Sequence, residues 1–262
     1  MINSSNVVEV ITKNKQYLDT VLTYVEQVKE INLAFRYEPI LAIKNYLSQH
    51  ANLLMFPSEN LDYGGMVTYK NGRYFVHINT MQPKLYENFV LAHEFFHFYF
   101  EAEKIRNSEV QTFADGSTPN EEERVANLFA AELLINSIVL NTLFLQMRNA
   151  YVGDKLENQV IRLIQAFKLP YKSLVIKLAQ DGLITLDEAV AIIDYDYRNA
   201  LPNDFDNSLL APSLSIQFDS VAELINDPIV IGNLRATDHK SSTELYQKHL
   251  SSLERLREKK KE

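Results

Sequence analysis

The chain has 262 residues, of which 46% are hydrophobic and 23% are charged. These proportions are ordinary for a globular protein, and the length suffices for one substantial core with a smaller attachment. The formal net charge of −8 argues against a general affinity for nucleic acid, which needs a basic surface. The sequence contains no cysteine, so any metal site must use histidine and carboxylate ligands.

The N-terminal sequence lacks a basic stretch followed by a long apolar run, so it does not resemble a signal peptide. No apolar run approaches the ~20 residues that are needed to span a bilayer. The lack of cysteine also fits a reducing compartment. We therefore expect a cytoplasmic protein that binds neither membrane nor nucleic acid directly.

The first half of the chain predicts helices and one β-hairpin. Apolar spacing indicates helices over residues 7–30 and 39–47. The turn sequence Lys-Asn-Gly-Arg then joins residues 66–69 to residues 74–78 as a hairpin. A helix over residues 83–104 follows, with Pro83 at its first turn.

The second half predicts mainly helices. Residues 107–120 are polar and indicate a loop, and Thr118 and Glu121 have the spacing of a capping box for a helix over 119–136. Shorter helices are expected over about 138–148, 155–168, 171–181 and 185–197. Residues 201–228 are rich in Asp, Asn, Ser and Pro and predict an irregular connection, and an amphipathic helix starts near Ser242.

The predicted fold class is therefore α+β. It is mostly helical, with a small β-sheet next to the helix over 83–104 and a C-terminal helical region. Residues 1–150 are expected to form the main domain and residues 151–200 a helical attachment. Residues 201–262 supply the irregular connection and the C-terminal amphipathic helix.

The most informative motif is His93-Glu94-Phe95-Phe96-His97, an H-E-x-x-H within a predicted helix. Residues i and i+4 lie on one helix face, so both imidazoles can reach one metal ion. Glu94 is turned about 100° from His93, beside the metal, where it can take a proton from water that the metal activates. The motif also occurs by chance on helix surfaces, but here it lies in an apolar stretch, where imidazoles need polar partners.

The third metal ligand must come from another element. The longer H-E-x-x-H-x-x-G-x-x-H pattern is absent, because Phe100 and Glu103 stand at the Gly and His positions. A carboxylate of the helix over 119–136 is therefore expected. Glu121 and Glu122 are better explained by stabilisation of the helix N-terminus.

Helical phase separates the remaining carboxylates of this helix. One face holds Glu121, Arg124, Leu128 and Glu132 and is predicted to face solvent. The other holds Glu123, Asn127, Ala130 and Leu134, so Glu123 is the preferred third ligand. Asn127, one turn further on, is expected to orient a ligand. Glu101 is the main alternative ligand and is otherwise expected to be solvated.

Three segments together resemble the ImmA/IrrE family of metallopeptidases. They read FVHIN at 75–79, NFVLAHEFFHFYF at 88–100 and ERVANLFAAELLIN at 123–136. The resemblance implies that His93 and His97 bind the metal, that Glu94 is the catalytic glutamate and that Glu123 is the third ligand. The sequence departs from the family pattern at Phe96, Val125 and Asn136, none of which is a ligand.

The resemblance implies that residues 1–150 are a zinc metallopeptidase domain whose substrate is a helix-turn-helix transcriptional repressor. The alternative is a non-cleaving, metal-containing module that docks on a regulator; an intact Glu94 favours catalysis. The strand over 73–79 is expected to be an edge strand beside the zinc that holds an extended substrate peptide. His77 is expected to have no catalytic part, and Tyr63, Tyr74 and Tyr99 are candidate donors to an oxyanion.

Overall fold

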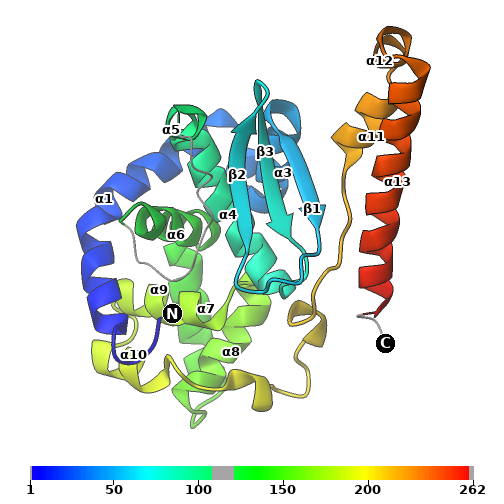
Figure 1. Cartoon of the computed structure of the whole chain (residues 1–262). Helices are drawn as coiled ribbons and strands as arrows, with labels where there is room; N and C mark the ends of the chain where they lie inside the picture. Colours follow the sequence, from blue (N-terminus) through cyan, green and yellow to red (C-terminus); the bar gives the residue numbers. More distant parts are fainter. Residues whose placement is uncertain (1, 108–120, 260–262) are drawn as a thin grey trace.

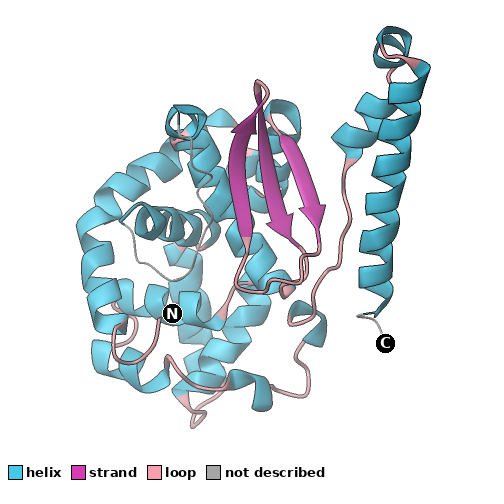
Figure 2. Ribbon diagram, viewed as in Figure 1, coloured by secondary structure: helices cyan, strands magenta, loops and turns pink. Residues whose placement is uncertain are grey.

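The structure is a computed structural model that describes residues 2–107 and 121–259 (Figure 1). The predicted loop over 107–120 and the predicted capping box at Thr118 therefore lie almost wholly outside the described residues. The described part is mostly helical with one small sheet (Figure 2), which confirms the α+β prediction.

The sheet has three strands in the order β1-β3-β2: β1 (Asn52–Phe56), β2 (Gly65–Lys70) and β3 (Arg73–Asn79). β2 and β3 form the predicted hairpin, and Asn71 and Gly72 both have positive φ values, 52° and 80°, as a type I′ turn requires. β1, which was not predicted, pairs parallel to β3, with Leu54 opposite His77.

The prediction that residues 73–79 form an edge strand is wrong, because β3 lies between the other two strands. The outer side of β1 is covered by a backbone bridge in which Met55 and Gln217 each donate an N–H to the other's carbonyl, at 3.1 and 2.7 Å. Within the described residues no second strand pairs with β2. β2 is therefore the open edge of this sheet.

The part of the chain that is described before residue 135 contains six helices. They are α1 (Val7–Ile31), α2 (Ala34–Tyr37), α3 (Pro39–His50), α4 (Lys84–Phe100), α5 (Ala102–Asn107) and α6 (Glu121–Leu134). α4 contacts β2, β3 and α6, and α1 packs on α6. The single helix predicted over 83–104 is instead two helices, because Glu101 leaves the helical conformation with φ −116° and ψ 14°.

The helices of the second half lie close to their predicted positions. They are α7 (Ser137–Ala150), α8 (Leu156–Phe167), α9 (Tyr171–Gln180) and α10 (Leu186–Ile192). Val7 and Ile11 at the start of α1 share one apolar cluster with residues of α8, α9 and α10. The N-terminal helix thus joins both halves, and the division at residue 150 stays a prediction.

The C-terminal region is more helical than expected, and its last helix begins at Ala236, six residues before the predicted start near Ser242. Residues 201–228, predicted as irregular, include the helix α11 (Asp219–Asn226), whose Val221, Leu224 and Ile225 have helical apolar spacing. α12 (Pro228–Asn233) and α13 (Ala236–Lys259) follow, and no described residue of either is buried. α11 to α13 form an arm beside the β1 side of the body (Figure 1).

No single helix within residues 2–107 and 121–259 is long and apolar enough to cross a membrane. α6 and α7 reach the required length and composition only as a pair, which bends by 68°.

Candidate active site

Three side chains from two helices converge on one point. His93 Nε2 lies 3.1 Å from both His97 Nε2 and Glu123 Oε2, and His97 Nε2 lies 3.5 Å from Glu123 Oε1. Ligands about 2.0–2.1 Å from a tetrahedral zinc ion are separated by about 3.3–3.4 Å. The two nitrogens and the carboxylate therefore fit a zinc ion in both donor chemistry and spacing.

The packing of α6 on α4 brings Glu123 to the histidines. Ala126 and Ala130 of α6 are fully buried, so their small side chains let the two helices approach closely. Glu123 and Asn127 lie one turn apart on the same side of α6. The structure thus assembles the group that helical phase had selected, whereas Glu121 is exposed and Glu122 pairs with Lys104.

Each imidazole has a polar partner on the ring nitrogen that faces away from this cluster. His93 Nδ1 lies 3.1 Å from Asn127 Oδ1, and His97 Nδ1 lies 2.5 Å from Glu101 Oε2. Such partners fix the ring orientation and leave the Nε2 lone pair available to a metal ion. Asn127 occupies its expected place. Glu101 is neither solvated nor part of the donor cluster, and its i+4 spacing from His97 is the signal that could have revealed this contact.

The cluster carries a charge imbalance that favours a cation. Burial lowers the pKa of His97, but hydrogen bonds to Glu101 and Glu123 outweigh burial and raise this pKa to about 10. Burial raises the pKa of Glu123, and the hydrogen bonds from His93 and His97 more than offset it, so the pKa is lowered. A bound divalent ion would replace the proton on His97, so metal affinity should weaken as pH falls.

Glu94 lies next to this group without joining it. Its side chain is buried, and its Oε1 atom has no hydrogen-bond partner within the described residues. Burial raises the pKa of this carboxyl group. A Cβ atom at Gly65 would lie 2.9 Å from Glu94 Cγ and 2.8 Å from the His77 carbonyl oxygen, so glycine is needed for β2 to approach Glu94 this closely.

Comparison with known families agrees with this geometry. Residues 48–179, about half of the chain, match the IrrE N-terminal-like domain, Peptidase_M78. The chain belongs to this family. The predicted resemblance is confirmed, and the chain is a metallopeptidase-family protein with a His-His-Glu group able to bind a metal ion. No curated protein sequence matches the chain significantly.

The matched region contains all three strands, both helices that carry the metal group (His93, His97 and Glu123) and the helices through most of α9. α1, which covers α6, and the residues beyond Ala179 lie outside it. The surroundings of the site are therefore built partly from segments that the family match does not include.

One face of α6 departs from prediction. Leu128 and Glu132, expected to face solvent, are 2% and 7% exposed. Lys177 Nζ of α9 lies 2.8 Å from both Glu132 carboxylate oxygens and 2.9 Å from Asp181 Oδ1. The buried ion pair explains how a carboxylate can occupy this position, and it ties α6 to α9.

Tyr63 and His77 form a hydrogen-bonded pair. His77 Nδ1 lies 2.5 Å from the Tyr63 hydroxyl, and Nε2 lies 3.2 Å from the Phe56 carbonyl oxygen. Burial lowers the pKa of His77 to about 4, so the ring is neutral, and the geometry suits Nδ1 accepting from Tyr63. Burial and the charge of Glu94 raise the pKa of Tyr63. Tyr74 donates its hydroxyl to the Ala102 carbonyl at 2.8 Å, which removes it as an oxyanion donor.

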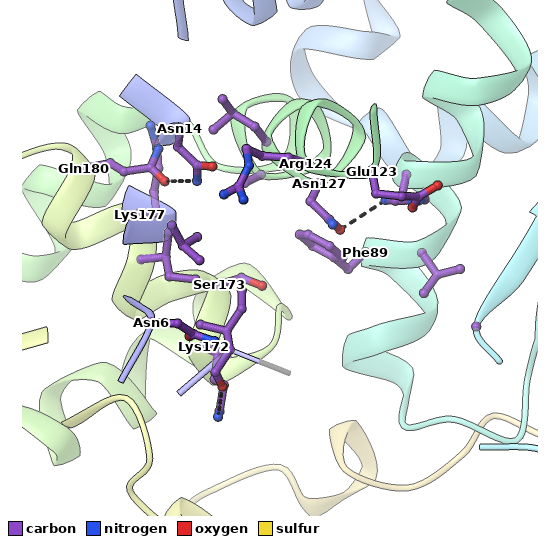
Figure 3. Close-up of a pocket in the computed structure, with 18 of the residues that line it drawn as sticks. Asn6, Asn14, Phe89, Glu123, Arg124, Asn127, Lys172, Ser173, Lys177 and Gln180 are labelled. Atoms are coloured by element: carbon purple, nitrogen blue, oxygen red, sulfur yellow. Dashed lines mark hydrogen bonds and ion pairs between the residues drawn. The ribbon is translucent and has the colours of Figure 1, made fainter. Parts of the chain in front are cut away.

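A cavity of about 520 Å³ opens from the metal group. At one end it is lined by Gly64, Gly65, Val90, His93 and Glu123. At the other it reaches α1 and α9, where Asn14 Nδ2 donates to Gln180 Oε1 at 2.8 Å (Figure 3). The cavity therefore connects His93 and Glu123 with the space between α1 and α9.

Proposed function

We propose that the chain is a zinc-dependent endopeptidase in which His93, His97 and Glu123 hold the ion and Glu94 is the catalytic base. Two imidazole nitrogens and one carboxylate converge next to a buried Glu94 oxygen that has no hydrogen-bond partner among the described residues, and this arrangement carries the proposal. Three protein ligands of this type leave a fourth position open, as catalytic zinc sites do. A purely structural site has no need of Glu94.

The side chains around the proposed zinc site have separate roles in the reaction. A bound zinc ion supplies Lewis-acid polarisation of the scissile carbonyl and activates water. Glu94 accepts a proton from the attacking water and delivers it to the leaving amine, a transfer for which a raised pKa is suited. Asn127 and Glu101 hold His93 and His97 in the orientation that leaves each Nε2 available.

We propose that the substrate backbone binds along the open edge of β2. Asn79 N donates to Gly64 O at 2.7 Å, so Gly64 faces β3. Backbone groups alternate in direction along an antiparallel strand, so Gly65, Val67 and Tyr69 present their N–H and C=O groups to the open side. An extended peptide can pair with these groups as a further strand.

The proposed substrate is a helix-turn-helix transcriptional repressor, cut in an extended linker. The family resemblance supports the substrate class, and the edge-strand seat favours a segment that can adopt an extended conformation. Such a substrate places the activity in the cytoplasm.

The test is incubation of the purified, zinc-loaded protein with the repressor encoded beside it, followed by mass spectrometry of the products. We expect one cut in a linker, its loss on chelation and its recovery with stoichiometric zinc. Glu123→Ala should lose both zinc and cleavage. Complex formation without any cut would favour the non-cleaving docking module.

A further inference from the structure

The cavity beside the metal group has an uneven distribution of charge. Six charged side chains line it: Glu9, Asp62, Glu123, Arg124, Lys172 and Lys177. Glu123 belongs to the metal group. The question is which of the remaining five are already neutralised by neighbours.

Both lysines of α9 are neutralised. Lys177 is held by Glu132 and Asp181, and it is 2% exposed. Lys172 Nζ contacts Asp194 Oδ1 at 3.1 Å and the Ile2 carbonyl oxygen at 2.5 Å. Both ammonium groups thus already have oxygen partners within the protein.

Of the carboxylates, Glu9 is exposed and pairs with Lys13 at 2.6 Å. Asp62 is exposed to solvent, where water satisfies a charge at little cost. Neither lies within ion-pair distance of Arg124, although the charges of Glu9 and Arg124 influence each other.

Arg124 is different. It is half-buried, and its guanidinium forms no hydrogen bond or ion pair with any residue among 2–107 and 121–259. In Figure 3 its side chain lies between Glu123 and Asn127 on one side and Asn14 and Gln180 on the other. It follows Glu123 on α6, so it is fixed to the helix that supplies the third metal ligand.

We propose that Arg124 binds a carboxylate of the substrate, within a few residues of the scissile bond. This inference rests on the proposed peptidase function, because it assigns the cavity to the peptide that the metal group would cut. A guanidinium presents two parallel N–H groups that match the two oxygens of a carboxylate, and the partial burial of Arg124 strengthens such a pair. Asn14, Ser173 and Gln180 line the same cavity and offer further amide and hydroxyl groups to a ligand.

The carboxylate has two sources, an Asp or Glu side chain or the C-terminus of a short peptide. Fluorescent peptides spanning the repressor linker distinguish them. One series places Glu or Gln at each position on either side of the cut, and the other compares a free with an amidated C-terminus.

Binding is measured on the zinc-loaded Glu94→Gln protein, so that cleavage does not consume the peptide. One position is expected to favour Glu over Gln by about tenfold, and Arg124→Gln should abolish that preference. Arg124→Glu should reverse it in favour of Lys at the same position. Arg148→Gln, which removes an arginine that lies over Phe144 outside the cavity, is the matched control and should preserve it.

The outcomes separate the two proposals. A charge preference that follows residue 124 supports the inference, whether or not wild-type protein cuts the peptide. If the wild-type protein binds the peptides with this charge preference but never cuts them, only the endopeptidase proposal fails. Cleavage with equal affinity for Glu and Gln peptides, and for free and amidated termini, overturns the role of Arg124. Circular dichroism and zinc content check that each variant is folded. Arg124→Lys keeps the positive charge without the paired N–H groups, so it should retain part of the preference for Glu over Gln.

Discussion

Glu101 Oε2 lies 2.5 Å from His97 Nδ1, on the side of the ring opposite the Nε2 atom that faces Glu123. The contact orients the ring and raises its basicity without placing Glu101 among the metal donors. Glu101 is also the residue at which α4 ends. Glu101 thus lies at the end of α4 and contacts His97, the last candidate metal ligand on that helix.

Glu101→Gln should weaken zinc binding by about 10–100-fold while leaving the site able to fill at high zinc, as expected for a group that acts through a ligand. Competition with a chromophoric chelator measures this affinity. Glu122→Gln is the matched control, because Glu122 pairs with Lys104 outside the cluster, and its affinity should not change. If Glu101→Gln empties the site and Glu123→Gln leaves it full, the two carboxylates have been assigned in the wrong order.

Val67→Pro tests the substrate seat on β2. The Val67 N–H faces the open edge, where proline is tolerated, so the protein should fold and keep its zinc. Loss of one backbone hydrogen bond should lower kcat/KM by up to about tenfold compared with Val67→Ala. Val67→Ala loses the same buried side chain but keeps the N–H, so it corrects for packing. Equal cleavage by the two variants would show that the peptide binds elsewhere.

Lys177→Met should destabilise the protein by about 3–5 kcal/mol, because it leaves Glu132 buried without its cation. Urea unfolding monitored by circular dichroism gives this value. The double variant Lys177→Met, Glu132→Leu should recover most of the loss, since no unpaired buried charge remains on α6. A double variant as unstable as the single one would mean that Lys177 acts mainly through Asp181.

His77 should make the protein less stable in weak acid. The pKa is about 4 in the folded state against 6.5 in the unfolded chain, so between these values only the unfolded chain takes up the proton. The contribution of the neutral ring is complete above pH 6.5 and is lost as pH falls toward 4. At pH 5 the free energy of unfolding should have lost about 2 kcal/mol relative to neutral pH. His77→Gln keeps one donor and one acceptor but does not titrate in this range. Between pH 7.5 and 5 the free energy of unfolding of wild type should therefore fall by about 2 kcal/mol more than that of His77→Gln. Parallel losses in the two proteins would remove His77 as the cause.

Local pattern was enough to predict the parts of the site that one helix determines. The i, i+4 spacing of His93 and His97 and the one-turn spacing of Glu123 and Asn127 are properties of single helices. The hairpin was predictable because Asn71 and Gly72 suit a turn with positive φ.

Long-range partners decided what pattern could not predict. Glu132 looked solvent-facing because its cation, Lys177, lies 45 residues away on another helix. β1 is a five-residue strand whose pairing with β3 is parallel, so no turn marks it, and its position makes β3 central. The helical phase of Arg124 predicted a surface position. In the structure Arg124 lines a cavity together with residues of α1 and α9, which are distant in sequence.

The most direct test of the account is Glu94→Gln, measured for zinc content and for cleavage of the repressor in the same preparation. The amide keeps the shape of the side chain but cannot accept the proton, so about one zinc per chain should remain while hydrolysis falls by at least 10²-fold. A zinc-loaded Glu94→Gln protein that cuts the repressor at the wild-type rate would contradict the assignment of Glu94 as the base.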